Sequence, residues 1–226
     1  MAASRHLPSA ISYLLSAIRH TCRLAILAER CYNYSERRDR RQTLNKESSK
    51  AQTKLLFDTS SLITAAQFGV GAQFLIEFVA GYAQVIIPEG VKAEAVDLGL
   101  QAGYSDALEL DRLIKAGAIT VAKAQPADPP FETVVAAYDV EPGDVEILRL
   151  CRLTSDYDHV VVDDRLLYLI LHRFTMRPIF LPDLIVVVAK ERAITEEIGE
   201  QLLKAIRSRY RTGFIEHSLL MLKGML

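Results

Sequence analysis

The sequence predicts an α/β fold in which helices cover both faces of a parallel sheet and a helical extension precedes it. Short apolar runs alternate with helical patterns from Lys54 onward, and most of these runs contain almost no polar residues. Strands of such continuous apolar character are buried on both faces, as in the parallel sheets of α/β proteins. The predicted strands are 54–57, 83–87, 118–122, 159–162 and 178–180.

Helical patterns occupy the segments between the predicted strands. Thr59, Ser60 and Ser61 offer hydroxyl groups suited to capping the helix that follows the first strand. Gly117 is placed to end another helix. The predicted helices span 71–82, 89–98, 105–116, 131–138, 143–153, 165–174 and most of 181–226.

Charge is distributed unevenly along the 226 residues. Residues 1–53 hold ten Lys and Arg against four Asp and Glu, whereas residues 54–226 hold seventeen against twenty-four. The polar segment 32–53 lacks apolar periodicity, which is typical of a linker or an exposed helix. The sequence therefore predicts a basic amphipathic helical extension and linker over 1–53, and a folded domain over 54–226. An organellar transit peptide is the alternative interpretation of the first 28 residues.

The sequence indicates neither secretion nor membrane insertion. The three cysteines, Cys22, Cys31 and Cys151, have no metal-binding spacing and cannot all form disulfides within the chain. This pattern favours a reducing compartment. The apolar stretch 7–28 carries charged residues near its middle and is a poor membrane span. We therefore expect a cytoplasmic protein that does not bind membranes.

Four acidic positions next to apolar runs are the most informative feature for function. Asp58 and Asp163 directly follow predicted strands. Asp144 lies at a predicted helix start, and Glu94 lies in the helix after the second strand. Because the carboxyl ends of parallel strands meet at one edge of a sheet, we expect these carboxylates to converge. Their mutual repulsion favours a bound Mg²⁺ or Mn²⁺ ion, and with it phosphate chemistry.

Each acidic position taken alone has a simpler explanation. An aspartate after a strand commonly forms a turn or caps the next helix, which applies to both Asp163 and Asp164. Glu94 and Asp144 are also compatible with helix ends, where carboxylates interact favourably with the helix dipole. The metal-site prediction therefore depends on the order, spacing and context of all four positions together.

Four short motifs occur in the order found in PIN domains. They are DTSSLI at 58–63, P-x-x-V-x-x-E at 88–94, G-D-x-E at 143–146 and V-D-D-R at 162–165. With the tail segments LPDLIVVVAKERAIT and RTGFIEHSLLMLKGML, residues 54–226 resemble PIN proteins of the VapC toxin type, especially those with a DDR-like fourth motif. The resemblance implies a three-layer α/β/α sandwich and a metal-dependent ribonuclease.

The resemblance also implies an acidic quartet that binds Mg²⁺ or Mn²⁺ and carries catalysis. Its members are Asp58, Glu94, Asp144 and Asp163, and Ser60 orients a ligand or a water molecule. Two positions have alternatives, namely Glu146 in place of Asp144 and Asp164 in place of Asp163. Arg149 and Arg165 are candidates for contacts with RNA phosphates, and a solvated helix face explains each of them equally well.

The resemblance implies partners as well as chemistry. Toxins of this type cleave RNA, are neutralised by an antitoxin protein and commonly form homodimers through their helices. The very apolar segment 181–189 is then either core or part of a partner groove. The competing hypothesis is a catalytically silent PIN-like scaffold that binds RNA or a partner protein.

Overall fold

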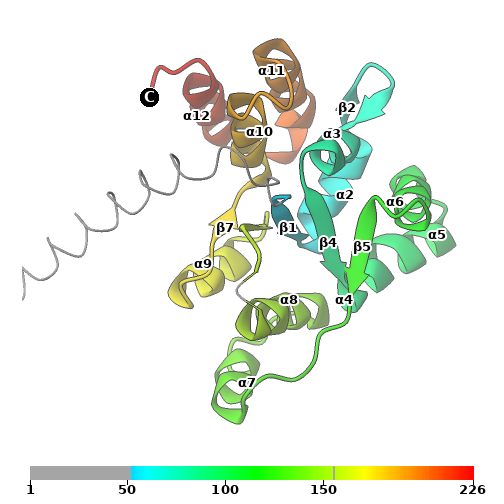
Figure 1. The fold of residues 1–226 in the computed structure, drawn as a ribbon, viewed down its shortest axis with the longest axis vertical. Coiled ribbons are helices and arrows are strands. Elements are labelled where there is room, and N and C mark those ends of the chain that lie inside the picture. The colour runs from blue at the N-terminus through cyan, green and yellow to red at the C-terminus, as the bar shows by residue number, and fades with distance from the viewer. Residues whose placement is uncertain (1–51, 155) are drawn as a thin grey trace, which may run out of the picture. The chain divides into compact units, whose positions relative to one another are not determined.

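A computed structural model describes residues 52–154 and 156–226. A five-stranded sheet forms its centre, in the order β5-β4-β1-β6-β7 (Figure 1). Its strands are β1 (Lys54–Phe57), β4 (Gln84–Pro88), β5 (Ile119–Ala122), β6 (His159–Val161) and β7 (Pro178–Ile179). The helical extension and linker predicted over 1–53 fall outside these ranges, apart from residues 52 and 53.

The sheet is parallel throughout, because every pair of neighbouring strands runs in the same direction. The first strand in the chain, β1, lies in the centre and pairs with both β4 and β6. Leu56 lies opposite Ile86 on one side and Val160 on the other, and all three side chains are buried. The predicted parallel sheet with apolar strands is therefore confirmed.

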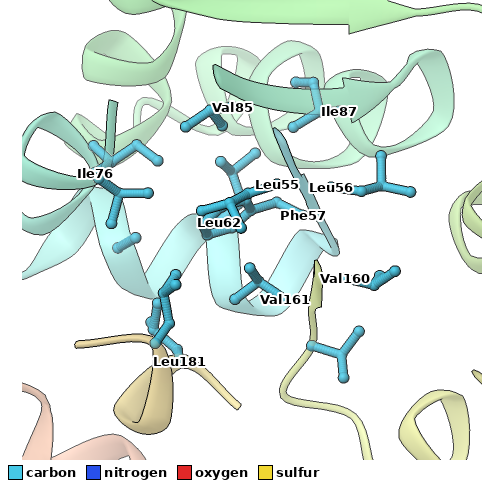
Figure 2. Close-up of a cluster of buried hydrophobic side chains, with 14 of the residues drawn as sticks. Leu55, Leu56, Phe57, Leu62, Ile76, Val85, Ile87, Val160, Val161 and Leu181 are labelled. Atoms are coloured by element: carbon cyan, nitrogen blue, oxygen red, sulfur yellow. The ribbon is translucent and has the colours of Figure 1, made fainter. Parts of the chain in front are cut away.

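Helices flank this sheet and complete the predicted α/β fold (Figure 1). Figure 2 shows Leu62 and Leu181 beside Val161 on one side of the sheet, with Leu56 and Val160 pointing to the other. The α-helices are α2 (Thr59–Gln67), α3 (Leu75–Tyr82), α4 (Glu89–Lys92), α5 (Gly99–Ala102), α6 (Ser105–Lys115), α7 (Pro129–Ala136), α8 (Pro142–Leu153), α9 (Arg165–Arg173), α10 (Leu181–Lys190), α11 (Glu196–Ala205) and α12 (Thr212–Leu222).

Two further helical segments have other geometries. A π-helical stretch, η1 (Ala93–Leu98), joins α4 to α5, and a 3₁₀ turn, η2 (Ile206–Arg209), follows α11. The last three α-helices pack against one another, since α10 contacts both α11 and α12, and α11 contacts α12. In the described part of the chain, no helix has the length and apolar character needed to cross a membrane.

One predicted helix begins later than its pattern suggested. The helix expected over 71–82 covers only Leu75–Tyr82, and a short hairpin of β2 (Gly69–Val70) and β3 (Gln73–Phe74) precedes it. Gly71 lies in the hairpin turn with a φ of 64°, which glycine adopts without strain. A Cβ atom on Gly69 would lie only 2.1 Å from the Gln73 carbonyl oxygen. The hairpin therefore depends on a close backbone approach between Gly69 and Gln73, which the hydrophobic pattern of the sequence does not indicate.

Candidate active site

Asp58 occupies the carboxyl end of the central strand and is only 3% exposed. Its Oδ1 atom accepts a hydrogen bond from the backbone N–H of Ser61 at 2.7 Å, and another from the Ser61 hydroxyl. Its Oδ2 atom accepts from the Ser60 hydroxyl and from the backbone N–H of Asp163, both at 3.1 Å. These four donors compensate the burial of the carboxylate and fix its orientation.

The cap of α2 differs from the sequence-based expectation. The three hydroxyl residues 59–61 were expected to cap this helix, but Asp58 is the N-cap residue itself. The Ser61 hydroxyl instead bonds to Asp58 and to the Val161 carbonyl oxygen, at 3.0 Å for the latter. Ser61 therefore ties the start of α2 to the end of β6, a role that its position in the sequence did not reveal.

Glu94 reaches the same edge of the sheet from the π-helical stretch η1. Its Oε2 atom accepts a hydrogen bond of 2.6 Å from the Thr59 hydroxyl, the residue directly after Asp58. A π-helical stretch changes the direction in which side chains leave a helix, and such stretches are frequent at functional sites. Thr59 was expected only as a helix cap, so its bond to Glu94 is a contact that sequence reasoning missed.

A close approach between α4 and α8 brings Glu94 to the start of α8. A Cβ atom on Gly90 would lie 3.1 Å from the Gly143 Cα, and one on Gly143 would lie 3.2 Å from Glu94 Oε1. Replacing Gly90 or Gly143 by a larger residue would therefore force α4 and α8 apart. Glu146 reinforces the approach, because its Oε2 atom accepts a 2.7 Å bond from the backbone N–H of Gly90. Glu146 therefore points toward α4 and supports the helix contact.

Asp144 lies in the first turn of α8, and the surroundings of its carboxyl group disfavour the charged form. Burial raises its pKa to about 7, and the charges of other nearby carboxylates add to this increase. Those carboxylates belong to Asp58, Asp164, Glu141 and Glu94. A cavity of about 250 Å³ lies beside Asp144 and is lined by Asp58, Thr59, Ser60, Asp139, Val140, Glu141, Asp144, Asp164 and Leu166. Of the predicted quartet, Asp58 and Asp144 line this cavity, whereas Glu94 and Asp163 do not.

The neighbouring residues Asp163 and Asp164 point in different directions. Asp164 caps α9 through a 2.7 Å bond from the backbone N–H of Leu167, and it also lines the cavity. Asp163 Oδ2 accepts a 2.5 Å hydrogen bond from the Tyr210 hydroxyl, which belongs to the segment between η2 and α12. Asp163 Oδ1 is buried without a hydrogen-bond partner among the described residues. Burial raises the pKa of Asp163 to about 6, against the opposing effects of the Tyr210 hydroxyl and the nearby backbone N–H of Leu181.

A family model described as a PIN domain matches residues 54–217. The chain belongs to the PIN-domain family. None of the curated proteins matches it. PIN domains are generally nucleases and typically depend on a divalent metal, so the match supports a nuclease.

The acidic side chains of this PIN domain fit a divalent cation by their chemistry. All of the candidate ligands are carboxylates, which suit hard cations such as Mg²⁺ and Mn²⁺. The raised pKa of Asp144 and the unpartnered Oδ1 of Asp163 both indicate that positive charge would be favourable here. Among the described residues, no three carboxylate, imidazole or thiol side chains already form a set of ligands for one ion. Several carboxylates bond instead to protein donors, namely Thr59, Ser60, Ser61 and Tyr210.

The two arginines considered for RNA contact lie in different environments. Arg149 forms an ion pair with Glu132 of α7, with an Nη2–Oε2 distance of 2.7 Å, and its side chain is 28% exposed. Arg165 is exposed at the start of α9. A third arginine, Arg209, lies close enough to Asp163 for its charge to lower the pKa of that carboxyl. Arg209 lies far along the chain from the acidic motifs, so no local sequence pattern indicated its position near Asp163.

The raised pKa of Asp144 predicts that the metal-free PIN domain loses stability between pH 6 and pH 8. The folded protein holds a proton on Asp144 up to about pH 7, whereas the unfolded chain releases it near pH 3.8. The contribution of Asp144 to the free energy of unfolding is therefore greatest below about pH 3.8, and it is lost as the pH rises through 7. Because Asp144 is partly exposed, we expect a loss of about 1 kcal/mol, or about 2–4 °C in Tm.

Calorimetric melting in the presence of a chelator checks this pH dependence. Asp144→Asn should remove most of the loss, because the asparagine side chain does not titrate in this range. Excess Mg²⁺ or Mn²⁺ should raise the Tm more at pH 8 than at pH 6, since cations bind the deprotonated carboxylates. A wild-type Tm that rises between pH 6 and pH 8 without metal would contradict the electrostatic description of the site.

Proposed function

We propose that this PIN domain is a Mg²⁺- or Mn²⁺-dependent endoribonuclease that hydrolyses RNA phosphodiester bonds. The observation that carries the proposal is the gathering of carboxylates around Asp144, at the edge of the sheet where parallel α/β folds bind ligands. Such a concentration of negative charge is unfavourable for a protein to maintain without a compensating cation. Membership of a nuclease family makes phosphodiester hydrolysis the chemistry that best fits it.

In this proposal Asp58, Glu94, Asp144 and Asp163 hold the cation and carry catalysis. When bound, Mg²⁺ or Mn²⁺ supplies charge neutralisation at a scissile phosphate and lowers the pKa of a nearby water molecule. The chain itself supplies orientation, because Thr59 fixes Glu94 while Ser60 and the Asp163 backbone fix Asp58. Carboxylates that are oriented in advance need little rearrangement as charge develops on the substrate.

The choice of the third and fourth acids is also part of the proposal. We retain Asp144 over Glu146, since the Glu146 carboxylate is bonded to the backbone of α4. We retain Asp163 over Asp164 because the Asp164 carboxylate caps α9, whereas one oxygen of Asp163 has no partner among the described residues. Asp164 still lines the cavity and adds to its negative charge.

We further propose that the RNA backbone is held by arginines beside the acidic crevice. Arg165 at the start of α9 stays a candidate, and Arg209 joins it because of its proximity to Asp163. Arginine contacts to phosphate oxygens position a nucleic acid without reading its sequence. Arg149 fits this role less well, because Glu132 already occupies its guanidinium group.

Cleavage of labelled RNA by the purified protein tests the proposed function. We expect cleavage with Mn²⁺ or Mg²⁺, none with a chelator, and recovery when metal is restored. Calorimetry should detect metal binding at millimolar concentrations. Cleavage that persists in the chelator would overturn the metal-dependent mechanism. RNA binding without either cleavage or metal binding would instead identify the silent scaffold.

We also propose that the chain is the toxin of a type II toxin–antitoxin pair, acting in the cytoplasm as a homodimer. The motif resemblance to VapC-type proteins supports this, as do exposed apolar side chains beside the crevice. Leu166 and Leu169 on α9 are about half exposed, and Leu166 lines the acidic cavity. An antitoxin covering these side chains would also obstruct the site. Expression should arrest the growth of a bacterial host, and co-expression of a small neighbouring reading frame should relieve the arrest.

The domain proposed over 54–226 extends slightly beyond the family match, which ends at residue 217. The remaining residues include the end of α12, and Leu222 of this helix is buried. Because α12 packs against α10 and α11, truncation at residue 217 would uncover part of the core. We therefore place these last residues within the nuclease domain, with residues 1–53 as a separate extension.

A further inference from the structure

Tyr210 lies outside the four acidic motifs and bonds directly to a member of the proposed quartet. Its hydroxyl donates to Asp163 Oδ2 at 2.5 Å, across 47 residues of sequence. The segment that carries Tyr210 connects η2 to α12. The bond therefore links the C-terminal helices to the carboxyl edge of the sheet.

The two oxygens of the Asp163 carboxylate differ in their environment. Tyr210 occupies Oδ2, whereas Oδ1 is buried and has no partner among the described residues. A carboxylate held in this way cannot rotate freely without breaking the tyrosine bond. One oxygen is thus fixed by the Tyr210 hydroxyl, and the other forms no hydrogen bond to a described residue.

The backbone of Asp163 extends this arrangement to Asp58. The Asp163 N–H donates to Asp58 Oδ2, which also accepts from the Ser60 hydroxyl. Two hydrogen bonds, one to the side chain and one from the backbone of Asp163, therefore connect Tyr210 to the Asp58 carboxylate. A shift of the Asp163 backbone would therefore also change the hydrogen bond that its N–H donates to Asp58.

We propose that Tyr210 is a positioning residue, which holds the Asp163 carboxylate in the orientation that binds the catalytic cation. The inference rests on the proposed metal-dependent function. Tyr210 itself touches neither the cation nor the RNA. Partners that hydrogen-bond to a metal-binding carboxylate typically change metal affinity by about 10–100-fold when they are removed.

Tyr210→Phe tests this role because it removes the hydroxyl and keeps the ring. We expect the Kd for Mn²⁺, measured by calorimetry on the full-length protein, to rise about 10–100-fold. RNA cleavage should be lost at low Mn²⁺ and should recover at saturating Mn²⁺. Tyr168→Phe is the matched control, since Tyr168 stacks on Phe180 with ring centroids 4.4 Å apart and its ring remains in phenylalanine. The control should leave both the Kd and cleavage unchanged.

A second measurement separates positioning from a loss of stability. In an Asp163→Asn background, adding Tyr210→Phe should produce no further change in Mn²⁺ affinity, because Tyr210 acts through Asp163. Each titration is carried out well below the metal-free Tm of the variant, so that the protein is fully folded and differences in Kd do not reflect differences in stability. A wild-type Kd in Tyr210→Phe, with only a lower Tm, would overturn the inference and leave the nuclease proposal standing. Tighter Mn²⁺ binding by this variant would likewise overturn it, since Tyr210 would then restrain Asp163 from the cation.

The wild-type titration keeps the two proposals distinguishable. Wild-type protein that neither binds Mn²⁺ nor cleaves RNA would overturn the proposed function and the inference together. Wild-type protein that binds Mn²⁺ and cleaves RNA, with Tyr210→Phe indistinguishable from it, would overturn the inference alone.

Discussion

Asp58→Asn is expected to reduce RNA cleavage about a thousandfold, the loss that corresponds to several kcal/mol of metal-assisted catalysis. Asparagine keeps the size of the side chain and can still cap α2 by accepting from the Ser61 N–H. It removes the negative charge, and its amide group faces the Asp163 N–H, which is also a donor. The variant should therefore fold but bind Mn²⁺ poorly, as measured by RNA cleavage and calorimetry on the same preparation.

A carboxylate far from the crevice provides the control for Asp58→Asn. Asp111 on α6 forms an ion pair with Lys115, at a distance of 2.6 Å. Asp111→Asn should retain wild-type cleavage and metal affinity, because this ion pair is on the protein surface. Equal cleavage by Asp58→Asn and the wild-type protein would remove Asp58 from the catalytic site.

The second large effect is expected at the start of α8, where Asp144 and Glu146 are the two candidates for the third acid of the quartet. Asp144→Asn should also lower cleavage about a thousandfold, since Asp144 lies among the charges of the crevice. Glu146→Gln should lower it less than about tenfold, because Glu146 supports α4 through the Gly90 N–H. We expect Glu146→Gln to cost about 1 kcal/mol of stability instead, through the weaker bond of a neutral acceptor.

Paired measurements of activity and stability distinguish these two acids. Steady-state cleavage at saturating Mn²⁺ should fall much further in Asp144→Asn than in Glu146→Gln, whereas the metal-free Tm should rise in the first variant and fall in the second. Asp144→Asn loses activity and gains stability at pH 8, whereas Glu146→Gln loses mainly stability. The reverse pattern would assign the third acid to Glu146 and the supporting contact to Asp144.

Much of the fold could be predicted from the sequence because its strands carry an unusually clear signal. The apolar run around Leu55 and Leu56 is typical of a strand buried on both faces, and the helical patterns that follow it indicate strand–helix alternation. The hairpin before α3 was missed because it depends on the close backbone approach at Gly69 and on the turn at Gly71. Such contacts leave little trace in hydrophobic periodicity.

The acidic residues were visible in the sequence, but their supporting contacts were not. Asp58 and Asp163 follow strands, so their arrival at one edge of the sheet follows from parallel topology. The bond between Asp163 and Tyr210 depends on how the C-terminal helices pack, which no local pattern encodes. Asp163 bonds to Tyr210, whereas Asp164 caps α9. This difference in partners also depends on tertiary contacts, because adjacent residues share the same sequence context.

The central position of β1 has a consequence for when the protein becomes active during synthesis. This strand leaves the ribosome before β6, which pairs with it, and long before the segment around Tyr210. Contacts that span so much sequence form late, after the intervening loops have closed. A nascent chain that has not yet released its last helices therefore lacks part of the proposed catalytic site, and the proposed RNA cleavage would begin only when translation of that chain is nearly complete.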